Sequence, residues 1–327
     1  MLPFLLAVAV LVAIPIPALW LFGSKTPVDT AIGFDPDTID SDLDAWLAGR
    51  EAAVPGIRPD LAKQIVWADP LRKERTDIAF VYIHGFSASP GEVRPLPDLL
   101  ARDFAANLHL ARLTGHAATP EAMGELTVKA MVEDLAEAIA IGERLGDRVV
   151  ILASSSGAAL ASWGLAQPAF RNRVSAAVFL SPNYGVLAFG AFLLTWPGAR
   201  ELARLLLGPT RSFEPSNALH AELWTNDYPV EALLPMAEIV RLAVGAPVET
   251  TATPCLFLIS PKDRVVDPRK TKRIAGRWGA PHRLVEVNGI EDPSRYVLAG
   301  EAMSPSTTRP LAALIATWLR ETLGPAR

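Results

Sequence analysis

Cysteine and histidine are scarce in this 327-residue chain, which has one cysteine and five histidines. A single cysteine excludes an internal disulfide, and its place in the apolar run PCLFLIS favours a buried, unreactive thiol at Cys255. No group of histidines and cysteines has the spacing of metal ligands, and no glycine-rich phosphate loop occurs. We therefore expect no metal, nucleotide or other cofactor.

Charged residues are also few, at 20% of the chain, with a net charge of −4 and no block of lysine or arginine. Nucleic-acid-binding proteins concentrate lysine and arginine on one face, so we expect no nucleic-acid partner. Apolar residues make up 50% of the chain, which excludes a disordered protein.

No charged residue occurs in residues 1–22, MLPFLLAVAVLVAIPIPALWLF, a stretch long enough to cross a bilayer as one helix. A cleaved signal peptide would begin with a basic residue and end at a small-residue site, and neither is present. We therefore expect residues 1–23 to form an uncleaved membrane anchor rather than a signal peptide or a buried core helix. Lys25 is the only nearby cation, so the orientation is weakly set, and a periplasmic or extracytoplasmic domain is a working assumption.

Continuous apolar runs recur along the chain with helical patterns between them. Continuous runs, rather than alternating ones, are typical of strands buried on both faces. Their alternation with helices predicts an α/β fold with a mostly parallel central sheet flanked by helices. The expected strands are residues 65–69, 79–86, 107–113, 149–154, 176–182, 254–260 and 282–288.

One segment, residues 185–246, interrupts this alternation, because it is apolar and helical and has no strand pattern. Its most apolar run, GVLAFGAFLLTW, is too short to span a membrane and ends at Pro197. Long insertions on α/β scaffolds commonly lie over the site, so we expect a helical lid. The expected organisation is an anchor (1–23), a stem and connecting segment (24–75), a first core part (76–184), the lid (185–246) and a second core part (247–327).

The strongest motif is Ala153-Ser154-Ser155-Ser156-Gly157, which lies directly between an expected strand and an expected helix. Small-x-Ser-x-Gly at such a junction is the nucleophile-elbow arrangement, which exposes the middle serine on a strained turn. Only centring on Ser155 places small residues suited to a close strand–helix approach on both flanks. Ser155 is therefore the predicted nucleophile, and a serine-rich helix cap without chemistry is the alternative.

A second motif, VYIHGFSASPGE at residues 81–92, ends an apolar strand in His-Gly-Phe. With the elbow, it makes roughly residues 76–325 resemble an α/β-hydrolase of the lipase, esterase and serine-aminopeptidase type. The resemblance implies an oxyanion hole formed by the backbone N–H groups of Phe86 and Ser156. It also implies that His84 organises this loop and is not the catalytic base.

The acidic member of the triad is expected in LFLISPKDRVVDP, residues 256–268, which matches the family's strand and following Asp-x-Val-Val loop. The resemblance places Asp263 at the acid position, where it would orient a histidine and stabilise its cation. Asp267 lies too far into the next helix for this role. A simple turn residue is the alternative for Asp263.

The triad histidine is missing, because no histidine follows His282, which opens the last expected strand at the edge away from the site. Tyr296 occupies the family's histidine position, and a neutral phenol with a pKa near 10 is a poor base at neutral pH. Four explanations remain open. His116 or His220 supplies the base, the chain has lost hydrolysis but kept a ligand pocket, Tyr296 acts as a tyrosinate beside a cation such as Arg295, or a substitution altered an otherwise active enzyme.

Two functions follow from these motifs. The first is a membrane-anchored serine hydrolase of esterase or lipase type that cleaves an apolar acyl ester. The second is a catalytically impaired protein of the same fold that binds a lipid-like ligand or a membrane partner. An apolar stripe in the expected lid favours an apolar acyl group, with ordinary lid packing as the alternative; it consists of Phe189, Phe192, Leu193, Leu194 and Trp196.

Overall fold

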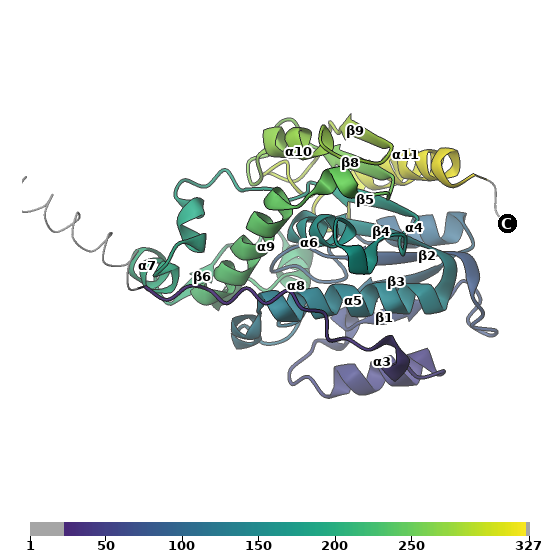
Figure 1. The fold of residues 1–327 in the computed structure, drawn as a ribbon, viewed down its shortest axis with the longest axis horizontal. Coiled ribbons are helices and arrows are strands. Elements are labelled where there is room, and N and C mark those ends of the chain that lie inside the picture. Colours follow the sequence, from purple (N-terminus) through teal and green to yellow (C-terminus); the bar gives the residue numbers. More distant parts are fainter. Residues whose placement is uncertain (1–22, 325–327) are drawn as a thin grey trace, which may run out of the picture.

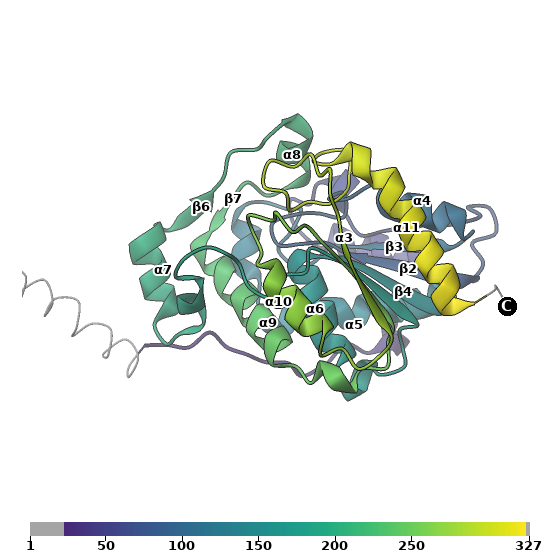
Figure 2. The same cartoon turned by 90° about the horizontal axis from the view of Figure 1, so that it is seen from above.

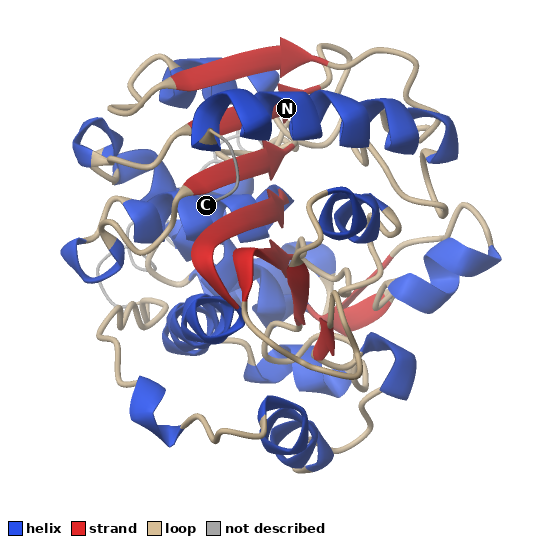
Figure 3. Ribbon diagram, turned by 90° about the vertical axis from the view of Figure 1, so that its right-hand side faces the viewer, coloured by secondary structure: helices blue, strands red, loops and turns tan. Residues whose placement is uncertain are grey.

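A seven-stranded sheet crosses the centre of the computed structural model, which describes residues 23–324 (Figure 1). Its strand order is β1-β3-β2-β4-β5-β8-β9; β1 is antiparallel to β3 and the other neighbouring pairs are parallel. The strands fan across the molecule with helices around them (Figure 3). They are β1 (Gln64–Val66), β2 (Thr76–Ile83), β3 (Asn107–Ala111), β4 (Gly146–Ser154), β5 (Ala176–Leu180), β8 (Cys255–Ile259) and β9 (His282–Glu286).

Helices cover both faces of the sheet, because alternate side chains of each strand enter different cores (Figure 2). In β2, Val81 and Ile83 pack with α5 and α6, whereas Phe80 and Tyr82 pack with α4 and α11. Each apolar run predicted as a strand therefore is one, and the predicted mostly parallel sheet is confirmed. The helices of this core are α4 (Leu96–Asp103), α5 (Val128–Leu145), α6 (Ser155–Leu165), α10 (Pro268–Ala275) and α11 (Pro305–Leu323).

The N-terminal part of the described chain runs from beside α7 (Ala199–Leu207) along the body to α3 (Leu43–Ala52) (Figure 1). The backbone N–H of Gly198 donates to the carbonyl of Ser24, and that of Gly33 donates to Glu133 on α5. Within residues 23–324, seven short 3-10 helices lie between the larger elements, at Pro36–Thr38, Pro59–Leu61, Glu121–Glu125, Pro168–Phe170, Ala191–Thr195, Val230–Ala232 and Val248–Thr250.

The predicted membrane location needs correction. Across residues 23–324, no helix has the length and apolar character needed to cross a membrane. The prediction depended on the hydropathy of residues 1–22, which lie outside the described residues. We therefore withdraw the membrane-anchored, extracytoplasmic location, which this finding contradicts.

Residues 185–246 contain α7, α8 (Ala218–Leu223) and α9 (Leu233–Gly245), and also two strands that the sequence did not predict. Strands β6 (Thr210–Ser212) and β7 (Asp227–Pro229) form a separate antiparallel pair. Helix α9 packs on α6 and buries Ile239 and Ala243 in the main core. That last helix is therefore part of the body, and a lid formed by the preceding residues stays a prediction.

Candidate active site

Ser155 lies where β4 ends and α6 begins, and its φ of +49° places a non-glycine residue in the left-handed region. Such a conformation costs about 1–3 kcal/mol and persists only when the surrounding structure enforces it. Gly157 explains how the turn closes: a Cβ atom there would lie 2.4 Å from the carbonyl oxygen of His84 and 2.7 Å from that of Ile83. The close approach of helix and strand expected from the small flanking residues is therefore present.

The His-Gly-Phe loop after β2 lies directly against Ser155. A Cβ atom on Gly85 would lie 3.0 Å from the Cβ of Ser155. In the described part of the chain, the backbone N–H groups of Phe86 and Ser156 donate to no protein acceptor. The Ser156 N–H belongs to the first turn of α6, where helix N–H groups point outward and carry partial positive charge. Two free donors are thus available close to Ser155.

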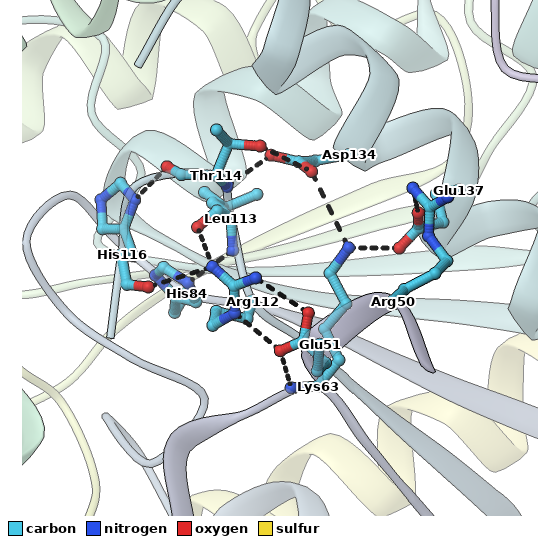
Figure 4. Close-up of polar contacts among 10 residues, drawn as sticks. All are labelled: Arg50, Glu51, Lys63, His84, Arg112, Leu113, Thr114, His116, Asp134 and Glu137. Atoms are coloured by element: carbon cyan, nitrogen blue, oxygen red, sulfur yellow. Dashed lines mark hydrogen bonds and ion pairs between the residues drawn. The ribbon is translucent and has the colours of Figure 1, made fainter. Parts of the chain in front are cut away.

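His84 holds this loop to the end of β3 (Figure 4). Its Nε2 accepts a hydrogen bond of 3.0 Å from the backbone N–H of Leu113. The proton therefore sits on Nδ1, which donates to the carbonyl of Gly85 at 2.8 Å. Burial and the neighbouring His116 lower the pKa of His84 well below its ordinary value, so the ring is neutral. These contacts agree with the loop-organising role that the resemblance implied.

His116 lies on the other side of the same loop, buried against the rings of His84 and Phe86. Burial lowers the pKa of His116 to about 4. Its backbone carbonyl accepts from Arg112, which also binds both carboxylate oxygens of Glu51 (Figure 4). These contacts build His116 into the support of the loop rather than placing it against Ser155.

Asp263 lies in the loop after β8, where the sequence placed it. Its Oδ1 accepts backbone hydrogen bonds from Val265 at 2.7 Å and Val266 at 2.9 Å. Burial raises the pKa of Asp263 to about 7, and these bonds oppose the shift only in part. Asp267 caps the N-terminus of α10 instead, which agrees with the prediction that it is not the acidic member of the triad.

Tyr296 lies in the loop between β9 and α11, and it lines the same small cavity as Ser155. Burial raises the pKa of its phenol above the ordinary value, the charges of Glu92, Asp263 and Asp292 raise it further, and the nearby Ser155 side chain opposes these effects. The phenol therefore stays protonated, which argues against a tyrosinate. Arg295 donates to a backbone carbonyl instead of supporting a phenolate.

Asp292, which the sequence reading did not single out, positions this loop. Its Oδ2 accepts from the backbone N–H groups of Tyr296 at 2.8 Å and Val297 at 2.9 Å. Ser181 adds a hydrogen bond of 2.7 Å from its hydroxyl to the carbonyl of Tyr296. The acidic residue of a D-P-S-R-Y turn was the available signal, because aspartate commonly accepts N–H groups a few residues ahead.

His220 and His282 make hydrogen bonds within their own segments. Nδ1 of His220 accepts from the backbone N–H of Ser216 at 3.1 Å, which leaves the proton on Nε2. The His220 ring packs edge-on against Trp224, with centroids 4.6 Å apart. His282 pairs with Cys255 at the start of β9, the end of the sheet away from Ser155, as predicted.

Glu92 is a buried carboxyl group beside Ser155 that the sequence reading missed. Its Oε2 accepts from the Gly85 N–H and from the Tyr82 hydroxyl, both at 2.8 Å. The Tyr82 hydroxyl lies 3.1 Å from Oγ of Ser154. Burial raises the pKa of Glu92 to about 7. Glu92 is the only charged residue of VYIHGFSASPGE, and that was the signal available in the sequence.

An apolar groove of about 720 Å³ lies beyond the site, and Ser155, Phe86 and Glu92 do not line it. It is lined by apolar side chains of residues 186–207 and by Tyr228, whose ring packs edge-on against Phe86 with centroids 5.2 Å apart. Val265, whose backbone N–H donates to Asp263, also lines the groove, as do Arg211 and Arg264. Within residues 23–324, no three histidine, cysteine, aspartate or glutamate side chains converge as metal ligands.

Residues 80–298 match the model of the alpha/beta hydrolase family. No curated protein sequence matches this chain. A structure reported with the metagenome-derived lipolytic enzymes LipS and LipT has a TM-score of 0.65 and 20% identity, over 81% of this chain and 99% of its own. A monoacylglycerol lipase from Paleococcus ferrophilus has the same fold, with a TM-score of 0.57 and 14% identity over 80% of this chain and 99% of its own. A monoglyceride lipase from Saccharomyces cerevisiae has it too, with a TM-score of 0.57 and 10% identity over 80% of this chain and 91% of its own. Because the family model covers more than half of its length, the chain belongs to the alpha/beta hydrolase family.

Proposed function

We propose that the protein is a serine hydrolase of esterase or lipase type that cleaves the ester of an apolar acyl group through Ser155. The observation that carries this proposal is the φ of +49° at Ser155, on a turn that only a glycine at position 157 allows to close. Strained backbone conformations are concentrated at functional sites, and they persist only where the surrounding structure enforces them.

In this proposal, Oγ of Ser155 attacks the acyl carbonyl and forms a tetrahedral intermediate. The backbone N–H groups of Phe86 and Ser156 donate to the oxyanion, and removal of one such donor typically costs a factor of about 100–1,000 in kcat. Asp263 and Tyr296 take the positions of the acid and the base. Tyr296 is the departure from the usual chemistry, since its phenol stays neutral.

The substrate class is inferred from the groove beside the oxyanion loop. Its lining is mainly apolar, and at about 720 Å³ it falls in the size range of small-molecule pockets. Two of the similar folds are lipases of monoacylglycerol or monoglyceride, which supports an apolar acyl chain. The predicted lid would cover this acyl chain with residues that precede α9.

A fluorophosphonate probe and short-chain aryl esters test the proposal together. The probe is expected to label wild type, and Ser155→Ala is expected to abolish labelling and to lower ester hydrolysis at least about 1,000-fold. Ser162→Ala is the matched control, because Ser162 is a buried serine on the same helix, and its labelling should persist. If wild type shows neither labelling by the probe nor hydrolysis of the esters, the proposal is overturned.

A second candidate is a protein that binds a lipid-like ligand without turnover, and the observation that favours it is the neutral phenol of Tyr296. Tyr296→His distinguishes the two candidates when it is assayed beside wild type and Ser155→Ala. Ordinary Ser155-dependent turnover by wild type excludes the second candidate. An inactive wild type that gains activity with Tyr296→His supports it.

A further inference from the structure

The carboxyl group of Glu92 and the side chain of Ser155 lie on either side of Gly85. A Cβ atom on Gly85 would lie 3.0 Å from the Cβ of Ser155 and 3.1 Å from Oε1 of Glu92, so both groups border the same point. Oε2 is engaged by the N–H of Gly85 and the hydroxyl of Tyr82. Oε1 makes no hydrogen bond with the described residues and remains available.

Ser155, Glu92 and Tyr296 also line one small cavity. Its volume of about 10 Å³ has room for about one water molecule. The cavity therefore places the predicted nucleophile, a carboxyl group and the Tyr296 phenol around a single shared space, which Val93, Leu180 and Leu298 also line.

We propose that Glu92 is the proton acceptor for Ser155 and that the neutral phenol of Tyr296 relays the proton between them. This inference rests on the proposed function. A phenol both accepts and donates hydrogen bonds, so it can take a proton on its oxygen while it gives up its own. The Tyr296 phenol stays neutral throughout, and no tyrosinate accumulates.

Glu92 fits this role better than Asp263 for two reasons. Oδ1 of Asp263 is held by two backbone N–H groups, and Asp263 does not line the small cavity. The charge of Glu92 also raises the pKa of Tyr296 more than the charge of Asp263 does. The titratable groups that face Glu92 are Tyr82 from β2 and Tyr296 from the β9–α11 loop, with Asp263 and Asp292 beyond the phenol.

The reaction balances without an added reagent. When Oγ of Ser155 bonds to the acyl carbon, the carbonyl electron pair moves to oxygen, the Ser155 proton passes to Tyr296, and the Tyr296 proton passes to Glu92. Collapse of the intermediate breaks the ester C–O bond, and the proton returns along the same path to the leaving alkoxide. A water molecule then attacks the acyl group, loses its proton to the relay, and Ser155 leaves as the reprotonated hydroxyl.

The test compares Glu92→Gln in two backgrounds with a short-chain aryl ester as the substrate. In wild type, Glu92→Gln is expected to lower kcat at least about 100-fold, the usual contribution of a proton-transfer group. It should also remove the rise of kcat with pH near 7, because the glutamine amide accepts the same hydrogen bonds but no proton. In Tyr296→His, the imidazole takes the Ser155 proton, so Glu92→Gln should cost less than about threefold.

Tyr296→Phe provides an independent variant that keeps the ring. It is expected to lose as much activity as Glu92→Gln, and the double variant should lose little more, because both belong to one path. Glu238→Gln is the matched control for replacing a buried glutamate, since Glu238 pairs with Arg241 on α9. Its kcat should stay within about twofold of wild type.

Each outcome supports or overturns the proposal that Glu92 accepts the Ser155 proton. An equal loss for Glu92→Gln in both backgrounds shows that Glu92 only supports the loop, and it overturns the inference. Unchanged kcat in Glu92→Gln overturns it too, while Ser155-dependent hydrolysis by the same preparation leaves the proposed function intact. Wild type without Ser155-dependent hydrolysis overturns both proposals.

Discussion

Tyr296 is predicted to occupy the position of the family's catalytic histidine, and its surroundings determine which proton transfers its phenol can support. In water, a Tyr phenol has a pKa near 10, and three nearby carboxyl groups together with burial raise the pKa of Tyr296 further. Ionisation of Tyr296 is therefore the least accessible of the proposed routes. A proton carried through the neutral phenol needs a terminal acceptor, and Glu92 is a buried carboxyl group with a pKa of about 7 beside it.

Gly157→Ala tests the close contact that shapes the nucleophile turn. The new methyl group would overlap two carbonyl oxygens at the end of β2, so we expect a loss of about 1–3 kcal/mol or more in the free energy of unfolding. Urea unfolding measures this loss. Gly49→Ala is the matched control: Gly49 lies inside α3 with no atom within 4 Å of the new methyl group, and alanine there should stabilise the protein by about 0.5–1 kcal/mol. Equal effects of both variants would contradict the prediction.

Residues at strand ends were predictable, whereas a buried carboxyl group was not. Ser155, Asp263 and Tyr296 follow strands whose carboxyl ends meet at one edge of a parallel sheet; Ser155 was predicted from the elbow spacing, and Asp263 and Tyr296 from the resemblance to the family. Glu92 lies in a loop, and its burial depends on the packing of Tyr82 and the β9–α11 loop against it. No local pattern encodes that packing.

At the scale of elements, a buried ion pair attaches the loop after β3, residues 112–116, to α3 (Figure 4). Arg112, just after β3, binds Glu51 of α3 at 2.7 Å through Nε and at 2.8 Å through Nη2. Its Nη1 also donates to the carbonyl of His116. The N-terminal connecting segment therefore stabilises the same loop that anchors His84.

Glu51→Gln is expected to lower the free energy of unfolding by about 3 kcal/mol, because it leaves the buried Arg112 guanidinium without its counter-charge. Urea unfolding monitored by circular dichroism measures the loss. Glu321→Gln is the control, since Glu321 pairs with Arg283 at the surface and its loss should stay below about 1 kcal/mol. A loss for Glu51→Gln no larger than that of the control contradicts the prediction.

The long elements were predictable and the short ones were not. The strands of the main sheet carry apolar runs because both faces are buried, and periodicity identifies such runs. Strands β6 and β7 are three residues each, and β6 is exposed along its whole length with the polar sequence Thr-Arg-Ser. Their pairing depends on neighbours rather than on their own pattern. The sequence did not predict that α9 belongs to the core, because an apolar helix has the same sequence pattern in a lid as in a core.

For the whole molecule, burial of histidines and burial of carboxyl groups have opposite consequences for the pH dependence of stability. His109 and His116 have their pKa lowered by burial to about 4, so they contribute stability that is lost as the pH falls from 6.5 towards 4. Glu92 and Asp263 have their pKa raised to about 7, so they contribute stability that is lost as the pH rises from about 4 towards 7. These dependences offset each other over much of the same pH range.

Glu92→Gln isolates one of these dependences when its stability is compared with that of wild type across pH. The unfolded chain releases the Glu92 proton near pH 4.5 and the folded chain only near pH 7, so wild type loses stability relative to the variant over that interval. The difference in the free energy of unfolding should change by about 3 kcal/mol between pH 4 and pH 8, since one pKa unit corresponds to about 1.4 kcal/mol. Urea unfolding at intervals of half a pH unit measures this difference. A constant difference across the range would show that folding leaves the pKa of Glu92 at its ordinary value of about 4.5, which contradicts a raised pKa at this position.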